Sequence, residues 1–86
     1  MVMTIGHEPD PRKRRRQRQG ALIRKMRVLR AMSIEELAQA CAVTSGAVSQ
    51  WETGRFTPRD EMQVRIARAL DVPWSSIFAL DAEVAS

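Results

Sequence analysis

The sequence has few of the side chains on which catalysis, metal binding and covalent cross-linking depend. Its 86 residues contain one cysteine, one histidine and no tyrosine. These can form neither an internal disulfide nor the four-ligand set of a structural zinc site. No apolar run approaches the roughly 20 residues that span a bilayer, and no secretory signal follows the start. We therefore expect no enzyme activity, cofactor, metal or membrane segment, and a cytoplasmic location.

Charge is plentiful but unevenly distributed along the chain. The overall net charge is +4. Residues 1–32 carry ten lysines and arginines against two acids, a net of +8, whereas residues 33–86 carry four arginines against eight acids, a net of −4. A polyanion would therefore be attracted mainly to the N-terminal third. The length suits one small domain with a modest core.

Two short amphipathic helices joined by a tight turn are predicted near the middle of the chain. An S-x-x-E capping box at Ser33 predicts a helix over 34–41. Thr44 is the N-cap candidate of a second helix over 45–52, and Gly54 can end that helix in the left-handed conformation. Since only two residues separate the first helix from Thr44, the helices must cross steeply. This is a helix-turn-helix pattern.

The segment LAQACAVTSGAVSQWETG, residues 37–54, resembles the signature of the lambda-repressor-like, Cro/XRE-type family of DNA-binding proteins. The matching positions are Leu37, Ala38, Val43, Thr44, Val48, Ser49, Gln50, Trp51, Glu52, Gly54 and Pro58. Flanking segments match as well, so the resemblance covers roughly residues 20–80. It implies an all-α fold, a compact five-helix domain with a helix-turn-helix.

A basic arm precedes this domain. We divide the chain into a flexible arm over 1–19, the DNA-binding domain over 20–80 and a frayed tail over 81–86. The cations of the arm are candidates for phosphate contacts: Arg12, Lys13, Arg14, Arg15, Arg16 and Arg18. Alternatively the run is a solvated tail, or it is disordered alone and extends the first helix on DNA. Asp10 and Pro11 could cap such a helix.

Gly20 is interpreted as the break after which the stable first helix begins, over about 21–31. The residues expected to face the core are Leu22, Ile23, Met26, Leu29 and Met32. The resemblance implies that Arg27 forms an internal salt bridge with Glu52, tying this helix to the end of the helix over 45–52. The alternative is an ordinary surface arginine.

The helix over 45–52 is the recognition helix by analogy with the family, in which such a helix meets base edges in the major groove. Its outward positions are the base-contact candidates: Ser45, Gly46, Ser49 and Gln50. Gln50 is the best reader because its amide can make a bidentate contact with adenine. Trp51 is assigned to the core, and Thr44 is a further candidate for a phosphate contact.

Two positions depart from the family pattern. Ile34 stands where the family usually has a glutamine that binds a phosphate, so this contact is lost here. Ala42 occupies the turn position where the family prefers glycine. If the backbone there is left-handed, a residue with a Cβ costs about 1–2 kcal/mol.

The loop after the recognition helix meets the DNA backbone in the family. Arg55, Thr57 and Arg59 are therefore candidates for phosphate contacts, the alternative being solvated loop charges. Thr57 and Pro58 are also interpreted as N-cap and first residue of a fourth helix that ends near 71. A fifth helix is predicted from 73 to about 79.

The C-terminal apolar residues exceed what a short terminal helix usually needs: Trp74, Ile77, Phe78 and Leu80. Part of this set is assigned to a dimer interface, with core packing as the alternative. A dimer would read two half-sites one helical turn apart.

The resulting hypothesis is a bacterial or phage transcriptional regulator, located at the nucleoid, that binds a pseudo-palindromic operator in double-stranded DNA as a homodimer. A repressor, a Cro-like switch and a phage immunity protein all fit. An antitoxin or a restriction-modification controller that also binds a protein partner remains an alternative. RNA binding is disfavoured because stacking aromatics are few.

Overall fold

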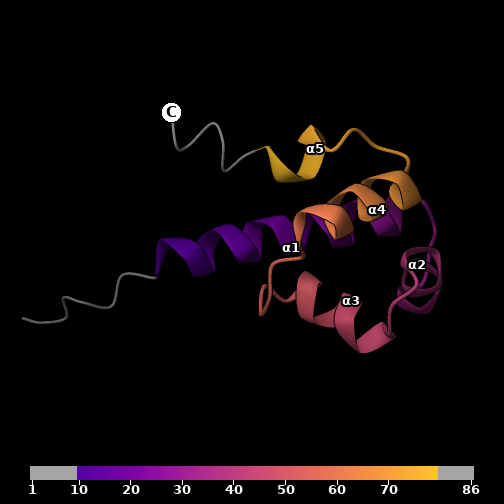
Figure 1. Cartoon of the computed structure of the whole chain (residues 1–86), viewed down its shortest axis with the longest axis horizontal. Helices are drawn as coiled ribbons and strands as arrows, with labels where there is room; N and C mark the ends of the chain where they lie inside the picture. The colour runs from indigo at the N-terminus through magenta and orange to yellow at the C-terminus, as the bar shows by residue number, and fades with distance from the viewer. Residues whose placement is uncertain (1–9, 80–86) are drawn as a thin grey trace, which may run out of the picture.

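The computed structural model describes residues 10–79, which form five α-helices (Figure 1). These are α1 (Pro11–Leu29), α2 (Ile34–Cys41), α3 (Ser45–Glu52), α4 (Asp60–Leu70) and α5 (Ser75–Phe78). The long α1 packs against α3, α4 and α5, while α2 packs against α3 and α4. The first turns of α1 project beyond the other helices (Figure 1). The predicted all-α, five-helix fold is confirmed for the described residues.

The first helix begins ten residues earlier than predicted. The Asp10 side chain accepts a hydrogen bond from the Arg12 backbone N–H (2.9 Å), and Pro11 occupies the first turn. The helix then runs through Gly20 to Leu29, so the predicted start after Gly20 is wrong. All six cations of the basic arm, from Arg12 to Arg18, therefore lie on a helix.

Gly20 is needed for packing rather than for a break. It is buried, and a Cβ built on it would lie 2.2 Å from the carbonyl oxygen of Trp51. The missing side chain lets the α1 backbone lie directly against the C-terminal end of α3. The loss of about 1 kcal/mol of helix propensity at a glycine is offset by this close contact.

The core gathers side chains from all five helices around α1. Its fully buried members include Ile23, Leu37, Cys41, Val48, Ile66, Leu70 and Ile77. Leu29 was expected here but is 68% exposed. Six residues after Ile23, it is rotated about 120° away from the buried face at 3.6 residues per turn. Met26 and Met32 pack partly against the core.

The two helices of the helix-turn-helix have the predicted bounds. The Ser33 hydroxyl accepts from the Glu36 N–H (3.0 Å), while the Glu36 carboxylate accepts from the Ser33 N–H (2.7 Å). This reciprocal capping box starts α2. Ala42 ends it in the left-handed region at φ 60°. The turn therefore carries the steric cost of about 1–2 kcal/mol that a Cβ brings there.

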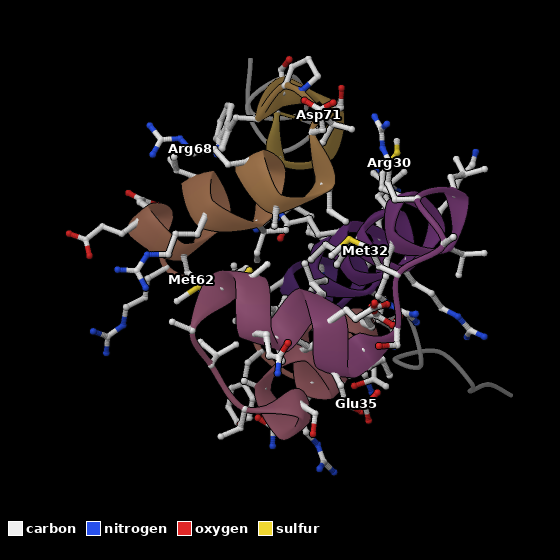
Figure 2. All side chains as sticks on the ribbon, turned by 90° about the vertical axis from the view of Figure 1, so that its right-hand side faces the viewer. Arg30, Met32, Glu35, Met62, Arg68 and Asp71 are labelled. Carbon is white, nitrogen blue, oxygen red and sulfur yellow. The ribbon has the colours of Figure 1, made fainter. Side chains whose placement is uncertain are left out.

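The last two helices are shorter than predicted. α4 begins at Asp60, with Arg59 rather than Thr57 at the N-cap position and no capping side chain. α5 is a single turn that starts at Ser75 instead of at Pro73. Figure 2 shows the C-terminal end of α4, where the Arg30 guanidinium donates to the carbonyl oxygen of Asp71 (2.9 Å). Within residues 10–79, no helix combines the length and apolar character that crossing a membrane requires.

Candidate nucleic-acid interface

The α3 helix presents a polar, uncharged face to solvent. Its outward residues are all exposed: Ser45, Gly46, Ser49 and Gln50. The opposite face is anchored by Val48 and Trp51, which are 0% and 7% exposed. The four predicted base-contact residues therefore lie together on one free surface, and Trp51 cannot stack on a base because its ring belongs to the core.

The start of α3 is fixed by Thr44. Its hydroxyl oxygen accepts a hydrogen bond from the Ala47 backbone N–H (3.2 Å), which satisfies one of the first N–H groups of the helix. The residue is exposed, and its hydroxyl proton remains a possible donor to a phosphate oxygen. Thr44 can thus serve as both cap and phosphate contact.

The end of α3 is tied to α1 by a buried ion pair. Arg27 Nε donates to Glu52 Oε2 (2.6 Å) and Arg27 Nη2 donates to Glu52 Oε1 (3.0 Å), with side chains only 11% and 6% exposed. The remaining terminal nitrogen of Arg27 donates to the Met32 carbonyl oxygen (2.8 Å). The hydrogen bond with Glu52 raises the pKa of Arg27 above its ordinary value. The sequence-predicted pair is therefore brought together, in a bidentate geometry.

A second link joins α1 to Gly54, two residues after the end of α3. Arg16 Nε donates to the Gly54 carbonyl oxygen (3.1 Å). Gly54 is buried at φ 79°, with Gln17 packed against it: a Cβ there would lie 2.6 Å from Gln17 Cγ. Arg16, predicted as a phosphate contact, thus holds the basic half of α1 in place. The sequence pattern alone did not distinguish Arg16 from the neighbouring arginines.

The other basic residues of the arm form a charged helical surface. Arg12, Lys13, Arg14 and Arg18 are exposed, while Arg15 is partly buried. The first turn of α1 contains no acidic residue to neutralise them. Arg16 and Gln17 of this stretch contact Gly54, so the basic half of α1 is tied to the segment that follows α3.

The loop from α3 to α4 carries the remaining predicted phosphate contacts. Arg55, Thr57 and Arg59 are all exposed, and Pro58 between them is buried. The loop begins with a hydrogen bond from the Arg55 backbone N–H to the Gln50 carbonyl oxygen (2.9 Å). It therefore continues directly from the outward face of α3. The 56% exposed Phe56 also lies here, and the sequence analysis did not single it out.

The apolar C-terminal residues do not form the predicted interface as a set. Ile77 and Phe78 are 0% and 3% exposed, so they belong to the core of one chain and are not available to a second copy. Trp74 remains 43% exposed. Leu80 lies outside the described residues. Apolar periodicity alone could not separate packing within the chain from packing between chains.

Neither a metal-binding cluster nor an exposed thiol occurs in the described part of the chain. Within residues 10–79, no group of three or more His, Cys, Asp or Glu could hold a metal ion. Burial raises the pKa of the Cys41 thiol above its ordinary value. The positive charge of Arg65 opposes this increase in part. A protonated, fully buried thiol is a core residue and a poor nucleophile.

The fold and this surface, a neutral helix with cations nearby, are those of a helix-turn-helix DNA-binding protein. The profile of the HTH_3 family, described as helix-turn-helix, matches residues 23–77, more than half of the sequence. The chain belongs to this family. A comparison with curated protein sequences gives no match.

Solved structures agree with the family. The clp gene regulator ClgR from Corynebacterium glutamicum is similar at 26% identity and a TM-score of 0.73, over 92% of this chain and 97% of that one. The restriction-modification controller protein C.AhdI from Aeromonas hydrophila shares the fold at 24% identity and a TM-score of 0.70, over 72% and 94%. A hypothetical transcription factor, NHTF, from Neisseria does so at 24% and 0.71, over 98% of each chain. By family and fold, the protein is a DNA-binding transcriptional regulator.

Proposed function

We propose that this regulator binds a pseudo-palindromic operator as a homodimer, with α3 in the major groove and the basic half of α1 along the phosphate backbone. The observation that carries the proposal is the division of the exposed surface. The outward face of α3 has no charge, whereas the N-terminal half of α1 and the loop after α3 offer exposed cations near its C-terminal end. Uncharged polar groups discriminate base edges, and cations bind phosphates without reading sequence.

Base recognition is assigned to the outward face of α3. Gln50 can donate to and accept from the major-groove edge of adenine, while Ser45 and Ser49 can pair with several bases. Gly46 is exposed, and the nearest atom to a Cβ built there is the Thr44 hydroxyl at 3.8 Å, so α3 offers a bare patch where a base pair can approach. The helix carries no arginine for guanine, so one half-site supplies modest selectivity. This favours a dimer that reads two half-sites.

Phosphate binding is assigned to two groups of residues beside α3. The proposed contacts from α1 are Arg12, Lys13, Arg14, Arg15 and Arg18. The proposed contacts from the turn and loop are Thr44, Arg55, Thr57 and Arg59. If most of the cations engage, the affinity should fall steeply with salt, because each neutralised phosphate adds about 0.9 to the slope of log affinity against log salt concentration.

The dimer contact is assigned to the surface around Trp74. This residue is 43% exposed. Large apolar side chains in partly exposed positions are typical anchors of protein interfaces. Sedimentation of the protein with and without operator DNA would measure the dimer, and a Trp74→Ala variant should shift it toward monomer.

The proposal is tested by selecting binding sites from random duplex DNA with the full-length chain. The expected result is an enriched pseudo-palindrome whose affinity exceeds that of a scrambled duplex by at least a thousandfold at physiological salt. Measuring both duplexes at several salt concentrations separates the sequence-dependent term from the phosphate term. If no duplex binds better than bulk DNA, α3 is not a specific reader and the proposal fails.

A further inference from the structure

Gln63, on α4, is a buried polar residue with both ends of its amide engaged. Only 8% of the residue is exposed to solvent. Its Nε2 donates to the carbonyl oxygen of Pro58 (3.0 Å), and its Oε1 accepts from the Trp74 indole Nε1–H (2.9 Å). A buried amide that satisfies two distant partners fixes them relative to each other, because losing either bond leaves a buried polar group unpaired.

The first partner lies in the loop that carries the proposed phosphate contacts. Pro58 is buried between the exposed residues Thr57 and Arg59. The loop has no capping side chain where it enters α4. The Gln63 backbone N–H donates to the Arg59 carbonyl oxygen (2.8 Å), and the Gln63 side-chain amide adds a second hydrogen bond that anchors this end of the loop to α4.

The second partner lies at the start of the last helix. Trp74 directly precedes α5, and its ring lies 6.2 Å from that of the buried Phe78. The indole N–H points to Gln63 while 43% of the residue faces solvent. The Gln63 side chain therefore connects α5 to a loop that immediately follows the recognition helix, across α4.

We propose that Gln63 is a positioning residue for DNA binding: through Pro58 it sets the loop so that Arg55 and Arg59 face the phosphate backbone, and through Trp74 it makes that setting depend on α5. This inference rests on the proposed function, because the loop must contact DNA for its position to matter. Gln63 itself does not touch DNA. It acts on affinity only through the loop.

The test compares three full-length variants in DNA-binding titrations across a range of salt. Gln63→Met keeps the length of the side chain and removes both hydrogen bonds. The double variant Arg55→Ala/Arg59→Ala removes the loop charges, and the third variant combines all three substitutions. Gln39→Met is the matched control, because Gln39 is an exposed glutamine on α2.

The expected result is non-additivity. Gln63→Met should lower the affinity about tenfold and make the salt slope shallower by about one, since it displaces a phosphate-binding cation. In the background without loop charges it should have little further effect, because there is no longer a contact to misplace. Gln39→Met should bind as the parent protein does.

Two outcomes would contradict the inference in distinguishable ways. If removal of the loop charges leaves affinity and slope unchanged, the loop does not contact DNA, and both this inference and that part of the proposed function fail. If the loop charges matter but Gln63→Met is silent, or its effect adds fully to theirs, only the role of Gln63 fails.

A second variant covers the case in which Gln63→Met does not fold. Trp74→Phe removes the indole donor but keeps an aromatic ring for the proposed dimer contact, and it changes an exposed residue, so the core is left intact. It should lower the affinity about threefold in the parent and have no effect once the loop charges are removed. Equal affinity of Trp74→Phe and the parent protein would overturn the dependence on α5.

Discussion

The basic half of α1 and the outward face of α3 are both exposed to solvent, yet they are built in opposite ways. The first carries four exposed cations: Arg12, Lys13, Arg14 and Arg18. The second carries no charge on its outward face. Under the proposed function, most of the phosphate-binding cations and the base-reading residues lie on separate helices, so that each set can be altered with little effect on the other.

What joins these two helices is a set of contacts at the C-terminal end of α3. Gly20 lets the backbones meet, Arg27 pairs with Glu52, and Arg16 binds the carbonyl oxygen of Gly54. All three contacts come from α1, and their partners lie within residues 51–54. The cations are thus held in a fixed register with the base-reading face.

The largest effect is expected from neutralising the arm, through the variant Arg12→Gln/Lys13→Gln/Arg14→Gln/Arg18→Gln. At 50 mM salt, affinity for any duplex should fall about a thousandfold, and the slope of log affinity against log salt should become shallower by about three to four. The ranking of operator variants should not change. Titration of several duplexes over a salt series measures all three quantities.

A matched control removes cations from other exposed positions: Arg24, Lys25 and Arg68, each changed to glutamine. This variant lowers the net charge of the protein by three but leaves the N-terminal half of α1 intact. It should weaken binding much less than the arm variant. An equal loss in both variants would show that overall charge, and not the arm, attracts DNA.

The next largest effect is expected on stability, from Arg27→Met. The substitution strands the Glu52 carboxylate, whose side chain is 6% exposed, without its bidentate partner. Breaking such a pair costs about 3–5 kcal/mol of unfolding free energy. Chemical denaturation followed by circular dichroism measures it. A loss below about 1 kcal/mol would mean that the pair is not the tie between α1 and α3.

Alanine at two glycines should act in opposite directions. Gly20→Ala gains about 1 kcal/mol of helix propensity, but its Cβ meets the backbone oxygen of Trp51 at 2.2 Å, so the net result should be a loss of about 1–3 kcal/mol. Gly46→Ala meets only the Thr44 hydroxyl at 3.8 Å and should gain about 0.5–1 kcal/mol. Thermal unfolding of both variants compares them. Stabilisation by Gly20→Ala would refute the close contact.

The most local effect, confined to one base pair, is expected from Gln50→Ala. The variant should lose about 1–3 kcal/mol of affinity for the selected operator and no longer distinguish the base pair that Gln50 reads. Its salt slope should match that of the parent protein, because glutamine carries no charge and releases no counterions. An equal loss of affinity for every base pair at that position would place Gln50 on the backbone instead.

The parts of the fold that were predicted correctly depend on local signals. The bounds of α2 and α3 follow from the caps at Ser33 and Thr44, whose hydrogen bonds join residues three apart in the sequence. The salt bridge between Arg27 and Glu52 was available because the family resemblance supplied it. These features are visible before any tertiary packing is known.

The features that were missed depend on contacts between distant segments. Gly20 resembles a helix break until the α3 backbone is seen beside it, and Arg16 resembles its neighbours until Gly54 is placed. Thr57 and Pro58 have the pattern of a helix start, but the Pro58 carbonyl is bound by Gln63 and the helix begins two residues later. Apolar periodicity also could not tell whether Ile77 packs within one chain or between two.

The bare, uncharged face of α3 has a consequence for how such regulators diverge. None of its outward residues contributes to the core, which is held from the opposite face by Val48 and Trp51. After a gene duplication, one copy can therefore acquire new target genes through a few substitutions on that face. The copy keeps its fold and its general attraction to DNA, so the intermediates of such a change remain working proteins.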